Sequence, residues 1–294
     1  MKISAFMPVT NAVARGDTFI EAIKTHLYFA DELVVVDGGS TDGTLEEVAQ
    51  INDPRIKIVH FDWPKEGWSW TQFCKTWNRG LVACTGDWVA AGESDHIFHK
   101  KDIPRLLDEL KREEEAGRAV VKVQKLQSCH WQSWSSKSQM YYFLNKAKFP
   151  QIRYGYDPNN KTDLCHPIWW GGDMIDDIPQ GVAIMERGPH EGLIGGTGVP
   201  LWNYLWTFKT FEMVVQERMK AARAWNMFPG FTQGYGKSFP TEEADVRVWI
   251  SQQLESLQKK SNRFFDLKDH PEIMQQKLTS ELKQDHIGAK IWAE

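Results

Sequence analysis

Two apolar runs in this chain are each followed at once by carboxylates. Asp37 follows the run 33–36 and precedes two glycines, and Glu93 and Asp95 follow the run 87–91. A carboxylate followed by glycines can contact the ribose or base of a nucleotide while leaving room for phosphates. Paired carboxylates can hold a hard divalent cation, which in turn binds a diphosphate. Taken alone, each motif also fits an ordinary turn between a strand and a helix.

The elements that would position these carboxylates alternate between strands and helices. The run 33–36 is rich in β-branched residues and is typical of a strand buried on both faces of a parallel sheet. We predict strands at 3–7, 33–36, 56–61, 87–91 and 119–126, and helices at 19–30, with Asp17 as its cap, 45–51, 70–84 and 102–116. This pattern predicts an α/β fold with a Rossmann-like, mostly parallel sheet flanked by helices. Because parallel strands end at one edge, the two acidic motifs would lie around one crevice.

The second half of the chain has weaker periodicity. We expect irregular structure with short helices or strands over 128–179, covering the crevice, a strand over 181–185, and a mobile glycine-containing loop over 192–198. Helices are predicted at 201–225, 242–260 and 272–286. The predicted division is a domain of residues 1–225, with a nucleotide-binding half (1–115) and an acceptor half (116–225), followed by a helical C-terminal extension (226–294) that stays outside the sheet.

Composition and charge restrict the class of protein. The chain has 41% hydrophobic and 25% charged residues, which is typical of a soluble globular protein, and its net charge of -4 argues against a nucleic-acid partner. Four scattered cysteines favour reduced thiols and a cytoplasmic location over disulfides or a zinc site. No apolar run approaches the roughly 20 residues of a transmembrane segment, and the start is too short for a signal peptide.

The segments 8–11, 32–44, 78–88 and 93–95 together resemble, in order and spacing, the family 2 glycosyltransferases of the GT-A fold. The resemblance covers about residues 1–115. It implies a nucleotide-diphosphate sugar as donor, a glycan or other hydroxyl acceptor, a divalent cation (Mn2+ or Mg2+) and inversion at the anomeric carbon. The segment 93–95 would occupy the place of the family's Asp-X-Asp motif, with Glu93 in place of the usual Asp and His96 in place of a following acid.

The resemblance also implies roles for individual residues. The donor would be bound by Pro8, Val9, Thr10, Asn11, Asp37, Gly39, Glu93 and Ser94. Asp95 would be the principal metal ligand. His190 would be a further ligand or a diphosphate contact, although a structural hydrogen bond fits it equally well.

The reaction needs a carboxylate downstream of Asp95 to take the proton of the acceptor hydroxyl, a contribution of typically ~100- to ~10,000-fold. Glu191 is our first candidate, because it follows a predicted strand and precedes the glycine loop. Its rivals are Asp173, Asp176 and Asp177, which follow an aromatic run. The tryptophans of the acceptor half can stack on a sugar, although core packing is the commoner role.

Two other functions are compatible with the sequence. A sugar nucleotidyltransferase would normally carry a glycine-rich loop after the first strand, whereas the first glycine here is Gly16. A non-catalytic carbohydrate-binding protein could retain the same fold, since fold alone does not establish activity. The altered Glu93 keeps this second alternative open.

Overall fold

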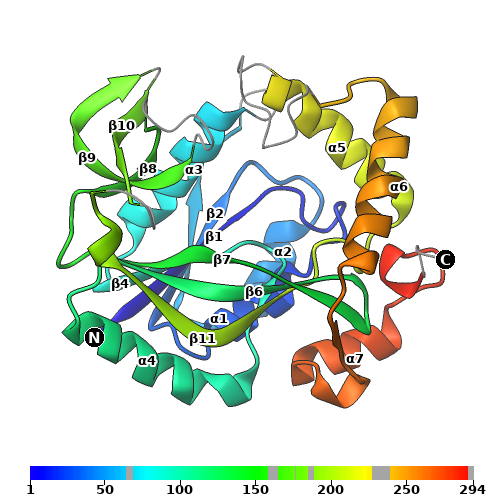
Figure 1. Ribbon diagram of the computed structural model, residues 1–294, viewed down its shortest axis with the longest axis horizontal. Coiled ribbons are helices and arrows are strands. Elements are labelled where there is room, and N and C mark those ends of the chain that lie inside the picture. Colours follow the sequence, from blue (N-terminus) through cyan, green and yellow to red (C-terminus); the bar gives the residue numbers. More distant parts are fainter. Residues whose placement is uncertain (64–68, 158–164, 176, 185–188, 227–238, 291–294) are drawn as a thin grey trace.

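The computed structural model describes residues 1–63, 69–157, 165–175, 177–184, 189–226 and 239–290 (Figure 1). In this part of the chain, a nine-stranded sheet has the order β3-β2-β1-β4-β7-β6-β11-β5, and β12 pairs with β7. Its strands are β1 (Ile3–Val9), β2 (Glu32–Asp37), β3 (Ile56–His60), β4 (Trp88–Ala91), β5 (His96–Ile97), β6 (Val120–His130), β7 (Ser133–Asn145), β11 (Ile194–Asn203) and β12 (Arg263–Phe264). A three-stranded sheet contains β8 (Ile152–Gly155), β9 (His166–Ile175) and β10 (Ile178–Ala183).

The predicted α/β fold with a mostly parallel sheet is confirmed in its first part. β1 pairs in parallel with β2 and β4, and β2 pairs in parallel with β3. β7 is antiparallel to both β4 and β6, and β11 is parallel to β6. Consequently β6 and β11 run in the same direction as β4, although an antiparallel strand separates them from it.

Helices cover both faces of this sheet (Figure 1). They are α1 (Phe19–His26), α2 (Thr44–Gln50), α3 (Trp70–Ala83), α4 (Ile103–Glu115), α5 (Phe211–Asn226), α6 (Glu243–Lys259) and α7 (Glu272–Ser280). Side chains of β2 alternate between two hydrophobic clusters: Leu33 and Val35 pack with α1 and α4, and Val34 and Val36 pack with α3. This double burial explains the unbroken apolar run at 33–36.

The prediction of irregular structure over 128–179 is wrong. β6 and β7 form a long hairpin, and β8–β10 form the small sheet that lies against α3. The Asn78 side chain on α3 fixes this contact, because it donates to the carbonyl of Tyr154 (2.7 Å) and accepts from the amide of the same residue (2.9 Å). Register shifts between β6 and β7 interrupt the alternation of inward and outward side chains, so a period of two did not reveal β7 or the part of β6 beyond residue 126.

Two other predictions need correction. Most of the glycine segment 192–198 belongs to β11, and 201–203 complete that strand, so the helix expected at 201–225 begins only at Phe211. Leu201 and Trp202 are buried because they pair with β6. The C-terminal helices α6 and α7 are confirmed. The segment between them, however, adds β12 to β7, so the C-terminal residues do not stay outside the sheet.

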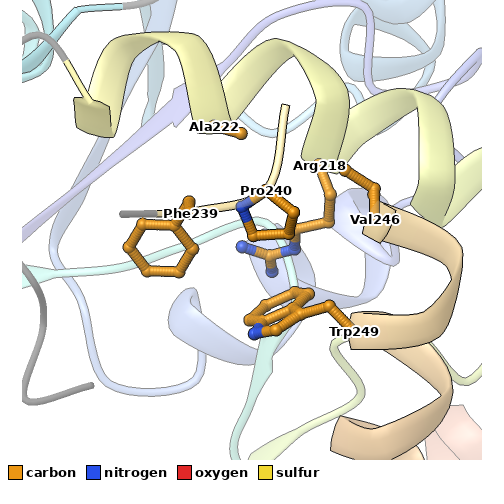
Figure 2. A pocket seen from close by; sticks show the side chains of 6 residues that line it. All are labelled: Arg218, Ala222, Phe239, Pro240, Val246 and Trp249. Carbon is orange, nitrogen blue, oxygen red and sulfur yellow. The ribbon is translucent and has the colours of Figure 1, made fainter. Parts of the chain in front are cut away.

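A small group of side chains, here called the α5–α6 joint, packs between α5 and α6. The Arg218 guanidinium lies over the ring of Trp249, with Phe239 and Pro240 beside it (Figure 2). The cavity at this joint is about 10 Å³, which is room for about one water molecule. We therefore interpret the joint as packing between helices. Within the described residues, every helix is too short or too polar to cross a bilayer.

Candidate active site

Asp37 and the acidic motif share one edge of the sheet, as predicted. Asp37 ends β2 opposite Val9 of β1, and Ala91 ends β4 opposite Phe6 on the other side of β1. Both strands run parallel to β1, so the residues that follow them emerge at the same carboxyl edge. Asp95 lies four residues beyond the end of β4 and is buried. This edge is where open α/β sheets bind ligands.

The Asp37 turn is tightly built. The Asp37 carboxylate is 2% exposed and accepts from the amides of Gly39 (3.2 Å) and Ser40 (3.0 Å), while His60 Nδ1 lies 3.2 Å away. A Cβ on Gly38 would stand 2.0 Å from Thr10 Oγ1 and 2.4 Å from the Trp63 ring, so only glycine fits. In this arrangement the carboxylate shapes the turn.

The loop after β1 is locked to this turn. The Asn11 amide donates to Ser40 Oγ (3.0 Å), and Asn11 Oδ1 accepts from the Thr41 amide (2.8 Å). Asn11 has a φ of 47°, a left-handed conformation that asparagine tolerates better than most residues. The predicted donor-binding residues 8–11 and 37–39 therefore lie side by side as one preformed surface.

The second part of the site is a group of three potential metal ligands, Glu93, Asp95 and His96, here called the acidic cluster. One ligand atom from each lies within 4.8 Å of the others. Asp95 Oδ1 is buried and has no hydrogen-bond partner among the described residues, and the same holds for His96 Nε2. Burial, followed by the neighbouring Glu93 carboxylate, raises the pKa of Asp95 to about 7. Two adjacent carboxylates with an unsatisfied buried oxygen fit a divalent cation.

His96 directs a ring N–H, and not a lone pair, toward the carboxylates of this cluster. Burial lowers the pKa of His96 well below its usual value, so the ring is neutral. Its Nδ1 accepts from the Glu93 amide (3.2 Å), which places the single ring proton on Nε2. Nε2 lies 3.6 Å from Glu93 Oε2 and 3.8 Å from Asp95 Oδ1. In this tautomer the N–H of His96 faces both carboxylates at distances too long for a hydrogen bond, and the ring does not itself offer a lone pair to a cation.

The predicted residues His190 and Glu191 lie elsewhere. Glu191 immediately precedes β11, whose first residue pairs with Val120 at the start of β6, at the amino edge of the sheet. Only the far end of β11 reaches the acidic cluster, where Asn203 pairs with His96. The β6 partners of the two ends of β11, Val120 and Gln127, are seven residues apart, so at about 3.3 Å per residue the start of β11 lies roughly 23 Å from the end that reaches the cluster. The geometry therefore gives Glu191 no support as a base beside Asp95.

His190 instead stacks on the Trp169 ring, with centroids 5.1 Å apart. Among the described residues, the acidic cluster consists of Glu93, Asp95 and His96, and His190 is not part of it. Glu191 itself borders an open hollow of about 460 Å³ with Glu113, Arg118 and Lys122. The structure thus assigns both residues to the amino edge of the sheet.

Two of the three aspartate candidates, Asp173 and Asp177, belong to the β9–β10 hairpin. Asp173 and Asp177 are exposed, and Asp177 forms an ion pair with Lys75 of α3 (2.9 Å). Asp176 lies outside the described residues. Their role as a base remains a prediction, because the structure does not bring them to the acidic cluster.

Sequence reasoning missed the residues that surround the acidic cluster. Asp17, expected to cap α1, makes no such cap; the position belongs to Thr18, and Asp17 accepts from Ser94 Oγ (2.9 Å) and pairs with Lys209 (2.7 Å). Asn203 is fully buried opposite His96, and both of its amide atoms lack partners. The only local sequence signal that could have placed Asp17 near the acidic cluster is its position just after the β1 loop. Asn203 and Lys209 carry no local signal of this kind.

Comparisons with known proteins agree with this site. The family model described as "Glycosyl transferase family 2" matches residues 4–177. The succinoglycan biosynthesis protein ExoO of Rhizobium meliloti (strain 1021) is 30% identical over 116 residues, which cover 38% of this chain and 31% of the relative. The chain therefore spans less than a third of the length of that curated relative.

Two solved structures have limited similarity to this chain. The crystal structure of S. aureus TarS 1-349 is 14% identical, with a TM-score of 0.44, over 88% of this chain and 81% of that chain. Glucosyl-3-phosphoglycerate synthase from Mycobacterium tuberculosis, in complex with Mn2+ and UDP-glucose, is 25% identical, with a TM-score of 0.32, over 42% and 43%. Because the family model matches more than half of the chain, in the segment that carries both parts of the site, the chain belongs to glycosyl transferase family 2.

Proposed function

We propose that this protein transfers a sugar, of the hexosyl type, from a nucleotide-diphosphate sugar to an acceptor hydroxyl. The observation that carries the proposal is the buried, unpartnered Asp95 Oδ1 beside Glu93, at the same sheet edge as the Asp37 turn. Membership of glycosyl transferase family 2 supports it. The relative ExoO is by its name a protein of succinoglycan biosynthesis, which favours a glycan as the acceptor.

We assign the parts of the chain as follows. Residues 1–115 bind the nucleotide, 116–225 face the acceptor, and 226–294 form a helical C-terminal extension. Glu93 and Asp95 would hold Mn2+ or Mg2+, and the bound cation would neutralise charge on the leaving diphosphate. The loop 8–11 and the turn 37–39 would hold the nucleoside.

The acceptor hydroxyl would attack from the face opposite the diphosphate and invert the anomeric carbon. This step needs a base from the acceptor half, for which Asp173 and Asp177 are the described candidates. We also propose a cytoplasmic location, which the thiols of Cys84 and Cys165 support, because cytoplasmic proteins keep their cysteines reduced.

The test is release of nucleoside diphosphate from a panel of UDP-, GDP-, ADP- and CDP-sugars, with Mn2+ or with a chelator. We expect one donor class to turn over with Mn2+. Asp95→Asn should reduce that rate by about 100-fold or more, because it removes a carboxylate that would hold the cation, and the cation stabilises the negative charge that develops on the diphosphate in the transition state. Asp108→Asn, an exposed carboxylate on α4 away from the site, is the matched control and should retain full activity.

Three outcomes would contradict the proposal. Full activity of Asp95→Asn would remove the cation site from the mechanism. Tight glycan binding without turnover of any donor would favour a carbohydrate-binding protein. Release of pyrophosphate from a nucleoside triphosphate and a sugar phosphate would identify a nucleotidyltransferase.

A further inference from the structure

Behind the acidic cluster lies a buried network of charges that the proposed reaction does not explain. Asp17 is at its centre: Oδ1 pairs with Lys209 Nζ (2.7 Å), and Oδ2 lies 3.2 Å from the Arg15 guanidinium. Glu217 of α5 pairs with both of these cations, at 3.1 Å and 3.2 Å. The side chains of Asp17 and Lys209 are each only 4% exposed.

Such a network stabilises a fold only weakly, because the desolvation of its buried ions opposes the attraction between them. Its two cations and two carboxylates cancel in charge, yet Asp17 and Lys209 lose most of their hydration on burial, whereas the side chains of Arg15 and Glu217 stay 45% and 27% exposed. Apolar side chains in such buried positions often give equal or better stability. Although burial acts to raise it, Arg15 and Lys209 lower the pKa of Asp17 below its usual value, so Asp17 is ionised. An ionised, fixed acceptor is suited to holding a hydroxyl group in one orientation.

That hydroxyl belongs to Ser94, the residue between the two carboxylates of the acidic cluster. Ser94 Oγ donates to Asp17 Oδ2 (2.9 Å), and Thr18 Oγ1 donates to the Ser94 carbonyl (3.4 Å). On the other side, the Tyr204 amide donates to the Asp95 carbonyl (3.1 Å). The turn that carries the acidic cluster is therefore held from the β1 loop and from the end of β11.

We propose that Asp17 is a positioning residue for the cation site, an inference that rests on the proposed function. Through Ser94 it fixes the turn that spaces the two carboxylates. Through Lys209 it ties that turn to the segment leading into α5. Loss of this link lets the two carboxylates separate and weakens cation binding, while the fold keeps its hydrophobic clusters.

The experiment measures Mn2+ affinity by calorimetric titration of the full chain with manganese chloride alone, without a sugar donor. Ser94→Ala removes only the hydroxyl and leaves the Asp17–Lys209 ion pair intact. We expect it to weaken Mn2+ binding by about 10- to 100-fold, the effect typical of removing an outer partner of a metal ligand. Asp17→Asn, which keeps the side-chain shape but loses the charge, should weaken binding to a similar extent.

Glu217→Gln is the matched control, since it removes a carboxylate from the same network without a bond to the acidic turn. It should keep wild-type Mn2+ affinity. Thermal unfolding of each variant separates positioning from stability, and Ser94→Ala keeps the test valid if Asp17→Asn does not fold. Wild-type Mn2+ affinity in Ser94→Ala would overturn the positioning role alone, whereas a wild-type protein that binds no Mn2+ would overturn both this role and the proposed cation site.

Discussion

Acidification should destabilise the protein through His270, a histidine of the C-terminal segment that is fully buried. Its Nδ1 is hydrogen-bonded to the Tyr204 hydroxyl (2.7 Å), and the Tyr204 amide donates to the Asp95 carbonyl. Burial lowers the pKa of His270 to about 4, against about 6.5 in an unfolded chain. The perturbation we consider is a decrease in pH from 7.5 to 5.0, with His270→Gln as the comparison.

The size and sign of the effect follow from this difference in pKa. The unfolded chain takes up the proton below about pH 6.5, while the folded protein resists it until about pH 4. Protons are therefore bound more strongly by the unfolded state, and stability falls as the pH decreases through this window. At pH 5.0 the loss from His270 is about 2 kcal/mol, a large part of a typical total of about 5–15 kcal/mol.

Urea denaturation at the two pH values measures this effect. We expect the wild type to lose about 2 kcal/mol more than His270→Gln between pH 7.5 and pH 5.0. His26, also buried with its pKa lowered to about 4, is present in both proteins and cancels in the difference. Equal losses in the two proteins would refute the reasoning, since they would show that the buried ring of His270 does not control the pH dependence.

Two further predictions concern the site. Glu191→Gln should leave turnover unchanged because Glu191 lies at the amino edge of the sheet. Asp177→Asn should reduce kcat by about 100- to 10,000-fold if Asp177 is the base. Steady-state kinetics measure both variants, and a large loss of kcat in Glu191→Gln would contradict our placement of the site. Gly38→Ala should cost about 1–3 kcal/mol and weaken nucleotide binding, because the added Cβ would stand 2.0 Å from Thr10 Oγ1. Thermal unfolding and nucleotide titration measure it, with Gly171→Ala, where an added Cβ meets nothing within 4 Å, as the control.

The sequence predicted the nucleotide-binding half well because its signals are local. A strand buried on both faces needs an unbroken apolar run, and 33–36 has one. The turn after it needs glycine, since Gly38 has no room for a Cβ and Gly39 has a φ of +83°. Parallel connections then bring Asp37 and Asp95 to one edge without any long-range information.

The acceptor half was predicted poorly because its strands depend on partners. β7 carries serines and aromatic residues whose burial depends on β6 and β4 on either side and on β12 from the C-terminal segment. β11 contains glycines and a proline that read locally as a loop, and it is a strand only because β6 pairs with it. The Asp17–Lys209 pair joins positions 192 residues apart in the chain, a distance that no local pattern reveals.

The same topology explains why Glu191 lies away from the acidic cluster. Glu191 is the first candidate for the base in the sequence because it lies downstream of the acidic motif and precedes glycines. Position along the chain, however, does not determine which edge of a sheet a residue reaches. Because β11 runs parallel to β4, its beginning lies at the amino edge and its end at the carboxyl edge. Within β11, the residues that reach the acidic cluster are therefore those at its end, near Asn203, and not those at its start, near Ile194.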